Sequence, residues 1–435
     1  MNDSLPAAFI ARMQKQLGAE LPAFLHEMDQ PALRGIRWNI LRKPPESERQ
    51  DFVKPVPWRS DAWYLAGDSA AGAEVLHEAG AYYLQEPSAM IPAAVLNAKP
   101  GERILDLCAA PGGKTTQIGI DMRGQGLLVS NDPVLKRAQV LSRNVERMGL
   151  THTAVICALP ETLSSRWERC FDAVLADVPC SGEGMFRRVP ASRTEWSAEK
   201  AEGCAERQRN ILHHAAALVR PGGRLVYSTC TYNPGENEEN VRWFLLHHPE
   251  FRICAFSLEG IDAPEGMFTC YPHRMEGEGQ FTALLVRQGE GFPESDAASG
   301  FPAPGKREKA VFMHAFPALP EPNLLFGQTL CRLETPIDLT GIKTLRLGLH
   351  LGEVRGSVPI PDHAAALMFR RPDMPLMETG PEDIRKYLGG ETLAGEAAGW
   401  MLITYRGYAL GWGKGSGGMI KNHYPRGLRG LHFTA

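Results

Sequence analysis

The stretch RILDLCAAPGGKTTQIGIDMRGQGLLVSND, residues 103–132, decides the fold class. The first apolar run, RILDLCAA, is followed by a turn of small residues that contains a Gly-Gly pair. The next segment, TTQIGIDM, suits a helix, and GLLVSND is a second apolar run. Strand, glycine-rich turn, helix and strand form the repeating unit of a parallel sheet with crossover helices. We therefore expect an open α/β core built outward from this unit.

The next 160 or so residues continue the same alternation. The expected strands are TAVICA, FDAVLADVP, RLVYSTC and FTALLVRQ, and the expected helices are PVLKRAQVLSRNVERMG, AERQRNILHHAAALVRPGG and ENEENVRWFLLHH. Pro133 stands near the start of the first of these helices and Gly149 just past its end, as is typical of helix termini. The pattern predicts a doubly wound, Rossmann-like, mostly parallel sheet.

The flanking regions differ from this core. The opening 40 residues have helical apolar spacing, LRKPPESERQDFVKPVPW reads as a loop, and a buried helix is expected to end near Asn97. Residues 288–320 are rich in Pro, Gly and Ala, and beyond them TLRLGLHLGEVR and GWMLITYRGYALGWGKG read as strands. The predicted division is 1–90 for an N-terminal module, 91–290 for the core, 291–320 for a linker and 321–435 for a C-terminal α+β region.

Composition limits the class of protein. The chain has 435 residues, of which 43% are hydrophobic, which is ordinary for a globular protein. It lacks a signal-peptide pattern and any run of about 18 apolar residues, so we expect a cytoplasmic protein without a membrane span. The nine cysteines form no Cys-x-x-Cys pair and no zinc-finger spacing, which predicts free thiols and no metal site.

Charge gives a mixed indication. The net charge is −3, but basic residues gather in residues 31–59 and in the tail from Lys414, which has no acidic residue. Such patches serve either as polyanion-binding surfaces or as ordinary solvated faces, and charge alone does not separate the two.

The turn Cys108–Lys114, CAAPGGK, favours a ligand at a helix N-terminus, where backbone N–H groups are exposed. A phosphate-binding P-loop requires glycine where Cys108 stands, and the dinucleotide fingerprint G-x-G-x-x-G is absent. The remaining ligand-binding interpretation is a loop for S-adenosylmethionine, with Asp132 at the end of the next strand placed to accept the ribose hydroxyls. A tight turn without a ligand is the structural alternative.

Two cysteines follow two other expected strands. Asp177-Val-Pro-Cys180 and Ser228-Thr-Cys230 both stand at strand carboxyl ends, where open α/β sheets bind ligands. A small buried hydrophobe explains either cysteine alone, but it explains the pair beside Asp177 less well.

One reaction requires this combination. Carbon 5 of a pyrimidine is too weakly nucleophilic to accept a methyl group unaided, and a thiolate that adds to carbon 6 activates it. A nearby acid stabilises the adduct through ring nitrogen 3, and a second thiol assists release of the product. Enzymes that methylate exocyclic amines instead carry Asn/Asp-Pro-Pro-aromatic after this strand, so Asp177-Val-Pro-Cys favours carbon as the acceptor.

With these residues, the chain resembles the RNA 5-methylcytosine methyltransferase family (Fmu/NOL1/NOP2/Sun-like), and within it the bacterial ribosomal RNA small-subunit methyltransferase F type. The motifs that carry the resemblance are LDLCAAPGGKT, DVPCSGEGMFR and YSTCTYNPGENEENV, supported by GAYYLQEPSAM, YPHRMEGEGQFTALLVR and IKNHYPRGLRG. It implies an S-adenosylmethionine-dependent methyltransferase core with flanking RNA-binding modules, of which the C-terminal one is PUA-like. The partner that it implies is RNA, and within that class small-subunit ribosomal RNA.

The resemblance also implies roles for single residues. Cys230 is the expected nucleophile, Cys180 promotes release of the product, and Asp177 touches both the cofactor and the cytosine. The cofactor would be held by the ribose contact at Asp132 and by a loop made of Cys108, Ala109, Ala110, Pro111, Gly112, Gly113 and Lys114. Family members often carry an acid that meets the adenine after the third strand, where this chain has Ala158.

Three rival functions remain open from the sequence. The first is the same chemistry on transfer RNA, and the second is a catalytically silent RNA-binding assembly factor on this fold. The third is a P-loop nucleotide hydrolase, which Cys108 disfavours. Arg187 and Arg188 are candidates for phosphate contacts, or are merely solvated.

Overall fold

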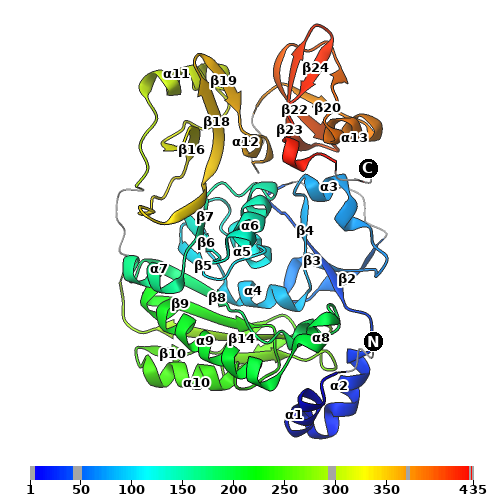
Figure 1. Cartoon of the computed structure of the whole chain (residues 1–435), viewed down its shortest axis with the longest axis vertical. Coiled ribbons are helices and arrows are strands. Elements are labelled where there is room, and N and C mark those ends of the chain that lie inside the picture. Colours follow the sequence, from blue (N-terminus) through cyan, green and yellow to red (C-terminus); the bar gives the residue numbers. More distant parts are fainter. Residues whose placement is uncertain (1–4, 43–50, 292–299, 369–372, 431–432, 434–435) are drawn as a thin grey trace.

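The computed structural model describes residues 5–42, 51–291, 300–368, 373–430 and 433. A nine-stranded sheet forms the centre, with the order β10-β14-β9-β8-β5-β6-β7-β17 and β13 paired to β14 (Figure 1). Strands β5 to β9 run parallel to one another, whereas β14, β10, β13 and β17 pair antiparallel with their neighbours. The strands span β5 Arg103–Asp106, β6 Leu127–Asn131, β7 Thr153–Cys157, β8 Phe171–Asp177, β9 Val219–Thr229, β10 Phe251–Ile253, β13 Met267–Cys270, β14 Gln280–Arg287 and β17 Lys343–Leu347.

Helices cover both faces of this sheet, because successive side chains of a strand point to opposite sides. Ile104 packs into one buried cluster with residues of α4 (Ile91–Leu96) and α5 (Gly113–Asp121). Leu105, its neighbour in β5, packs into another cluster with residues of α9 (Ala198–Leu218) and α10 (Glu238–His247). Helix α7 (Pro160–Arg166) contacts α9, and α6 (Leu135–Arg147) lies against β7. The predicted doubly wound core is confirmed.

The winding of the sheet reverses at β5, which pairs with β6 on one side and β8 on the other. In open α/β sheets, ligands bind outside the carboxyl ends of the strands at such a switch point. Asp106, Asn131 and Asp177 are the last residues of three strands that meet there.

The N-terminal module differs in part from what the sequence predicts. Helices α1 (Ala7–Leu17) and α2 (Leu21–Met28) form as expected, but residues 34–38 of the expected helical stretch form strand β1. Part of the expected loop, residues 52–56, forms β2, while its residues 43–50 lie outside the described part of the chain. These strands join β3 (Arg59–Leu65) and β4 (Tyr82–Leu84) in an antiparallel sheet of order β2-β3-β1-β4.

Tertiary pairing explains both differences. Ile36 and Trp38 of β1 are buried in a cluster that the strand reaches only by lying between β3 and β4. Pro55 is tolerated in β2 because this strand stands at the sheet edge, where a missing N–H donor costs little.

The C-terminal region contains two further sheets (Figure 1, top). The first contains β15 Leu324–Phe326, β16 Thr329–Arg332, β18 Leu349–Arg355 and β19 Val358–Pro361. The second contains β20 Leu376–Glu378, β21 Leu393–Ala394, β22 Gly399–Tyr405, β23 Tyr408–Ser416 and β24 Met419–Asn422. Helices α11 (Lys306–Ala315), α12 (His363–Leu367) and α13 (Pro381–Gly389) accompany them.

Two features of this region depart from the predicted division. Helix α11 lies within the range expected to be a linker, and its Phe312 is fully buried. Strand β17, from the expected C-terminal region, pairs with β7 and so completes the central sheet. The chain then passes directly from β17 of the central sheet to β18 of the first C-terminal sheet, with only Gly348 between them. Among the described residues, no helix is both long and apolar enough to cross a bilayer.

Candidate active site

The turn between β5 and α5 is fixed by buried hydrogen bonds. Asn131, the last residue of β6, accepts the N–H of Ala109 with its backbone carbonyl at 2.8 Å and donates its side-chain amide to the carbonyl of Leu107 at 3.0 Å. Gly112 has a φ of 115°, a conformation that favours glycine, and α5 begins at the next residue. The glycine-rich turn lies between a strand and a helix, as predicted, and the structure places the start of α5 at the switch point.

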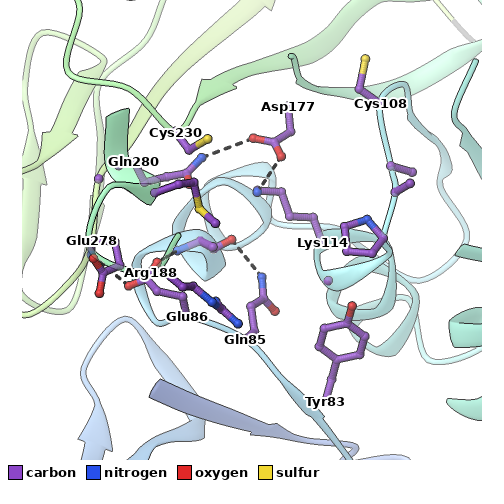
Figure 2. Close-up of a pocket in the computed structure, with 18 of the residues that line it drawn as sticks. Tyr83, Gln85, Glu86, Cys108, Lys114, Asp177, Arg188, Cys230, Glu278 and Gln280 are labelled. Atoms are coloured by element: carbon purple, nitrogen blue, oxygen red, sulfur yellow. Dashed lines mark hydrogen bonds and ion pairs between the residues drawn. The ribbon is translucent and has the colours of Figure 1, made fainter. Parts of the chain in front are cut away.

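A cavity of about 260 Å³ lies above this turn (Figure 2). Its walls come from the core and from the end of the N-terminal module, which contributes Tyr83–Glu86 and Ala89. The core contributes Asp106, Cys108, Ala109, Ala110, Pro111, Gly113, Lys114, Asp177, Gly184, Met185, Arg188, Cys230, Glu278, Gly279 and Gln280. Six of the predicted cofactor-loop residues thus line the same cavity as Asp177 and Cys230.

Asp177 is held by two donors across this cavity (Figure 2). The Lys114 ammonium lies 2.7 Å from its Oδ2, and the Gln280 amide donates to its Oδ1 at 3.3 Å. Burial lowers the pKa of Lys114, but the adjacent Asp177 carboxylate outweighs this effect and raises the pKa above its ordinary value. Lys114 therefore stays charged in the cavity wall, and Asp177 faces the cavity beside a fixed cation.

The two predicted thiols lie in contact. The Sγ atoms of Cys180 and Cys230 are 3.2 Å apart, and the backbone N–H of Cys230 donates to Cys180 Sγ at 3.3 Å. The hydrogen bond with Cys230, together with burial, raises the pKa of Cys180 well above its ordinary value. Cys180 is thus held as a thiol, and Cys230 is the member of the pair that lines the cavity.

Cys108 has a different environment from this pair. It is 7% exposed, and burial raises its pKa well above the range of a reactive thiol. Its contribution to the cavity is therefore a small apolar wall, not a nucleophile.

Asp106 is a functional candidate that sequence reasoning missed. It is fully buried and lines the cavity, and Thr115 donates to its Oδ2 at 2.6 Å, while its Oδ1 has no hydrogen-bond partner among the described residues. Burial raises its pKa to about 7. The sequence does contain a signal for Asp106. It is a carboxylate at the end of the first core strand, two residues before Cys108 in the same motif.

Asp132 does not line the cavity. Its Oδ1 accepts the N–H of Val134 at 3.0 Å, and its Oδ2 lies 3.3 Å from the Arg137 guanidinium, which is about half exposed. The structure therefore places Asp132 at the expected strand end but brings it together with Arg137. Gly112 also lies outside the lining, because it supports the turn from behind, against Leu141.

The structure separates the two arginines that the sequence left undecided. Arg187 is buried and donates to the Glu278 carboxylate at 2.7 Å. Arg188 is exposed, lines the cavity, and has no hydrogen-bond or ion-pair partner among the described residues (Figure 2). Arg187 is a structural cation, whereas Arg188 is available to a ligand.

Family models match three parts of the chain. Residues 93–286 match the family model described as 16S rRNA methyltransferase RsmB/F, and residues 5–87 match the N-terminal domain of 16S rRNA methyltransferase RsmF. Residues 375–430 match the methyltransferase RsmF PUA domain, which is the second C-terminal sheet with α13.

Full-length relatives have the same organisation. The chain is 31% identical to ribosomal RNA small subunit methyltransferase F of Cronobacter sakazakii, over 99% of this chain and 98% of the relative. It is 30% identical to the protein of the same name from Escherichia fergusonii, over 97% and 96% of the two chains.

Solved structures resemble the core. A methyltransferase homolog protein from Pyrococcus horikoshii superposes with a TM-score of 0.53 at 27% identity, covering 62% of this chain and 91% of that one. NSun6 from the same organism, solved with SFG, gives a TM-score of 0.56 at 19% identity. This match covers 67% of this chain and 100% of that chain, and it shows a likeness of fold. The chain described here belongs to the RsmB/F family of 16S ribosomal RNA methyltransferases.

Proposed function

We propose that this protein transfers the methyl group of S-adenosylmethionine to carbon 5 of a cytosine in 16S ribosomal RNA, with Cys230 as the covalent nucleophile. One observation carries the proposal: Cys230 lines the same cavity as the Cys108–Lys114 turn and Asp177, with a second thiol 3.2 Å away. A cavity for a cofactor alone does not require a pair of thiols, and a merely structural pair of cysteines does not require the cavity.

The residues present fit the cofactor. Asp106 lines the cavity together with Ala109, Ala110 and Gly113, and one of its buried carboxylate oxygens has no hydrogen-bond partner among the described residues. It therefore offers an acceptor to an ammonium group where small side chains leave room. When bound, S-adenosylmethionine supplies an electrophilic methyl group. The turn Cys108–Lys114 and Asp106 would hold its amino-acid part, and Asp132 is proposed to meet the ribose by exchanging Arg137 for the sugar hydroxyls.

The chain's own residues would carry the rest of the chemistry. The Cys230 sulfur, as a thiolate, forms a bond to carbon 6 of the cytosine, and the displaced electron pair makes carbon 5 nucleophilic. Asp177 is proposed to share a proton with ring nitrogen 3 of the adduct, and the Lys114 charge beside it would stabilise the charge that develops on the ring. After carbon 5 is methylated, its proton passes to water, the double bond between carbons 5 and 6 forms again, and the sulfur–carbon bond breaks with its electron pair returning to Cys230. Cys180, held as a thiol against Cys230, is proposed to assist this release.

RNA binding is proposed for the modules on either side of the core. The N-terminal module contributes one wall of the cavity, and the PUA-like sheet carries Lys414 and Lys421 on neighbouring strands. A base buried in this cavity has to be flipped out of its stack, and backbone phosphates held by basic side chains position it. Because such contacts release counterions, RNA binding is expected to weaken as salt rises.

The proposal is tested by incubating the purified protein with methyl-labelled S-adenosylmethionine and either 16S ribosomal RNA, small subunits or total transfer RNA. The expected result is 5-methylcytosine at a single 16S position, read by bisulfite sequencing. Methylation confined to transfer RNA would contradict the ribosomal target, and binding of RNA without any transfer would identify a non-catalytic factor.

A further inference from the structure

The two thiols of the proposed mechanism are supplied by separate loops, and their contact needs an explanation. Cys180 follows β8 and Cys230 follows β9, and the direct contacts between them are a thiol–thiol contact and one N–H···S bond. Sulfur is a weak donor and a weak acceptor, so these contacts do not hold two loops in register by themselves.

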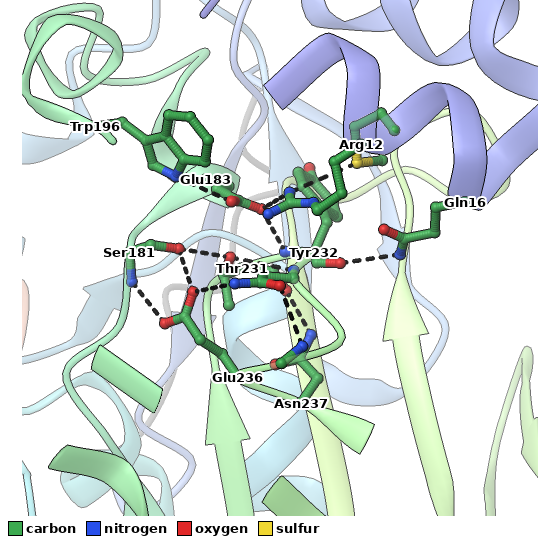
Figure 3. Close-up of polar contacts among 12 residues, drawn as sticks. Arg12, Gln16, Ser181, Glu183, Trp196, Thr231, Tyr232, Glu236 and Asn237 are labelled. Atoms are coloured by element: carbon green, nitrogen blue, oxygen red, sulfur yellow. Dashed lines mark hydrogen bonds and ion pairs between the residues drawn. The ribbon is translucent and has the colours of Figure 1, made fainter. Parts of the chain in front are cut away.

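The buried carboxylate of Glu236 links the loop after β8 to the loop after β9 (Figure 3). Glu236 Oε2 accepts the backbone N–H of Ser181 at 2.9 Å, and its Oε1 accepts the Ser181 hydroxyl at 2.5 Å. The Ser181 hydroxyl in turn lies 2.9 Å from that of Thr231. Ser181 is the neighbour of Cys180 in the chain and Thr231 is the neighbour of Cys230, so a single side chain connects both cysteine-bearing loops.

Further donors fix the position of Glu236 itself. Gln208 of α9 donates to its Oε2 at 2.9 Å, and Asn233 donates to its Oε1 at 3.2 Å. Glu236 is fully buried and has no cationic partner among the described residues. Burying a carboxylate without a counter-ion is costly, and an apolar residue of similar size would avoid that cost. The carboxylate serves as an acceptor for donors from the loop after β8, from α9 and from the loop after β9.

From this geometry we infer that Glu236 is a positioning residue, which holds Cys180 within reach of Cys230 by tying Ser181 to the loop that follows β9. Only one part of the inference rests on the proposed function, namely the expected effect of Glu236 on the rate of methyl transfer. Glu236 touches neither thiol in the contacts described, so it acts through Ser181 and Thr231 and is not a catalytic residue.

A second anchor links the same loops to the N-terminal module. Glu183, three residues after Cys180, accepts Arg12 of α1 at 2.6 Å and the backbone N–H of Tyr232 at 3.1 Å (Figure 3). The backbone N–H of Gly184 also donates to the Cys230 carbonyl at 2.9 Å. The Gly184 bond fixes the backbone of Cys230, and the Glu183 contacts lie two to three residues beyond the thiols, whereas Glu236 is the anchor on the Cys180 side through Ser181.

The test measures the thiol pair without any RNA or cofactor. Phenylarsine oxide bridges two neighbouring thiols: two As–S bonds form, and the arsenic-bound oxygen leaves as water with both thiol protons. Peptide mapping by mass spectrometry identifies the bridge between Cys180 and Cys230, and Cys180→Ala provides the background from the other cysteines. In Glu236→Ala the bridging affinity is expected to fall roughly tenfold, since both Ser181 donors lose their acceptor. In Glu236→Gln it should fall less, because the amide keeps one of the two acceptor oxygens.

Two comparisons separate positioning from folding. Glu236→Asp keeps a carboxylate and should restore part of the affinity, whereas Glu239→Gln, on an exposed side chain of the same segment, should behave as wild type. Ser181→Ala removes the hydroxyl between Glu236 and Thr231, and it provides the test if the Glu236 variants do not fold. Wild-type bridging in Glu236→Ala, or in Ser181→Ala where the Glu236 variants fail to fold, would overturn the inference.

The same variants should show a split in their kinetics. We expect kcat for RNA methylation to fall while KM for S-adenosylmethionine stays unchanged, because the cofactor turn is untouched. An unchanged kcat would contradict the consequence for turnover. If the wild-type chain transferred no methyl group, the proposed function would fail, and the arsenical result would still decide the role of Glu236.

Discussion

The two walls of the cavity differ in how they are built and in what they are expected to do. The core wall comes from strand ends at a single switch point, and it carries the groups with reactive chemistry: Asp106, Lys114, Asp177 and Cys230. The N-terminal wall comes from Tyr83–Glu86, which the antiparallel sheet of the flanking module brings across the opening. Arg188 is an exposed cation at this cavity. We expect changes in the core wall to alter the chemical step, and changes at Arg188 to alter RNA affinity.

The largest effect is expected at the nucleophile. Cys230→Ala should lower kcat by at least roughly 10³-fold, because without the Cys230 sulfur no bond forms to carbon 6 and carbon 5 is not activated. Calorimetric binding of S-adenosylmethionine should persist, since the Cys108–Lys114 turn is unchanged. Cys254→Ala, at a half-buried cysteine outside the cavity, is the matched control and should keep full activity. Turnover at a normal rate without Cys230 would refute its assignment.

A smaller loss is expected at the acid of the core wall. Asp177→Asn should lower kcat by roughly 10²-fold, since the amide cannot exchange a proton with the ring or pair with Lys114 as an anion. Single-turnover rates of methyl transfer measure this loss, with Asp262→Asn, at an exposed side chain of the short strand Ile261–Ala263, as the control. A variant that lost only cofactor affinity, with kcat unchanged, would place Asp177 outside the chemical step.

Arg188 distinguishes the two kinds of effect. Arg188→Ala should raise KM for RNA roughly tenfold with little change in kcat, and it should reduce the salt dependence of binding, as expected for one lost phosphate contact. Arg207→Ala, at an exposed arginine of α9, should leave both quantities unchanged. A fall in kcat with KM unchanged would instead assign Arg188 to the chemical step.

The smallest effect near neutral pH concerns four histidines that do not line the cavity. Burial lowers the pKa of His77, His350 and His363 to about 3 and that of His152 to about 4. In the unfolded chain these side chains bind protons below about pH 6.5, so stability is fully present above that pH and is lost as the pH falls toward 4. Denaturant unfolding should therefore show a decreasing free energy between pH 6.5 and 4. His363→Gln should reduce this slope, and an unchanged pH dependence would show that His363 is not part of it.

The same contrast explains how much of the site the sequence predicts. The core wall follows from local patterns: a strand, a small-residue turn and a helix place Cys108–Lys114, and strand ends place Asp177, Cys180 and Cys230. The roles of the two thiols came from the family resemblance, since spacing does not rank them. Asp106 carried a signal in the same motif and was overlooked.

The N-terminal wall has no comparable local signal. Gln85 and Glu86 stand in a stretch that reads only as the approach to a buried helix, and they reach the cavity because β4 pairs with β1, whose helical spacing was misleading. Strand β17 joins β7 across nearly 190 residues of sequence, and α11 forms because Phe312 and Phe316 find a buried cluster. Long-range burial decides these elements, and it is not visible in a window of sequence.

The most direct test of the central claim is to trap the proposed bond. Cys180→Ala protein incubated with target RNA and S-adenosylmethionine should accumulate an RNA–protein adduct that survives a denaturing gel, with the RNA on the peptide that contains Cys230. The adduct should disappear in the Cys180→Ala, Cys230→Ala double variant. Free turnover by the single variant would contradict the release role of Cys180, and an adduct that persisted in the double variant would contradict the account of Cys230.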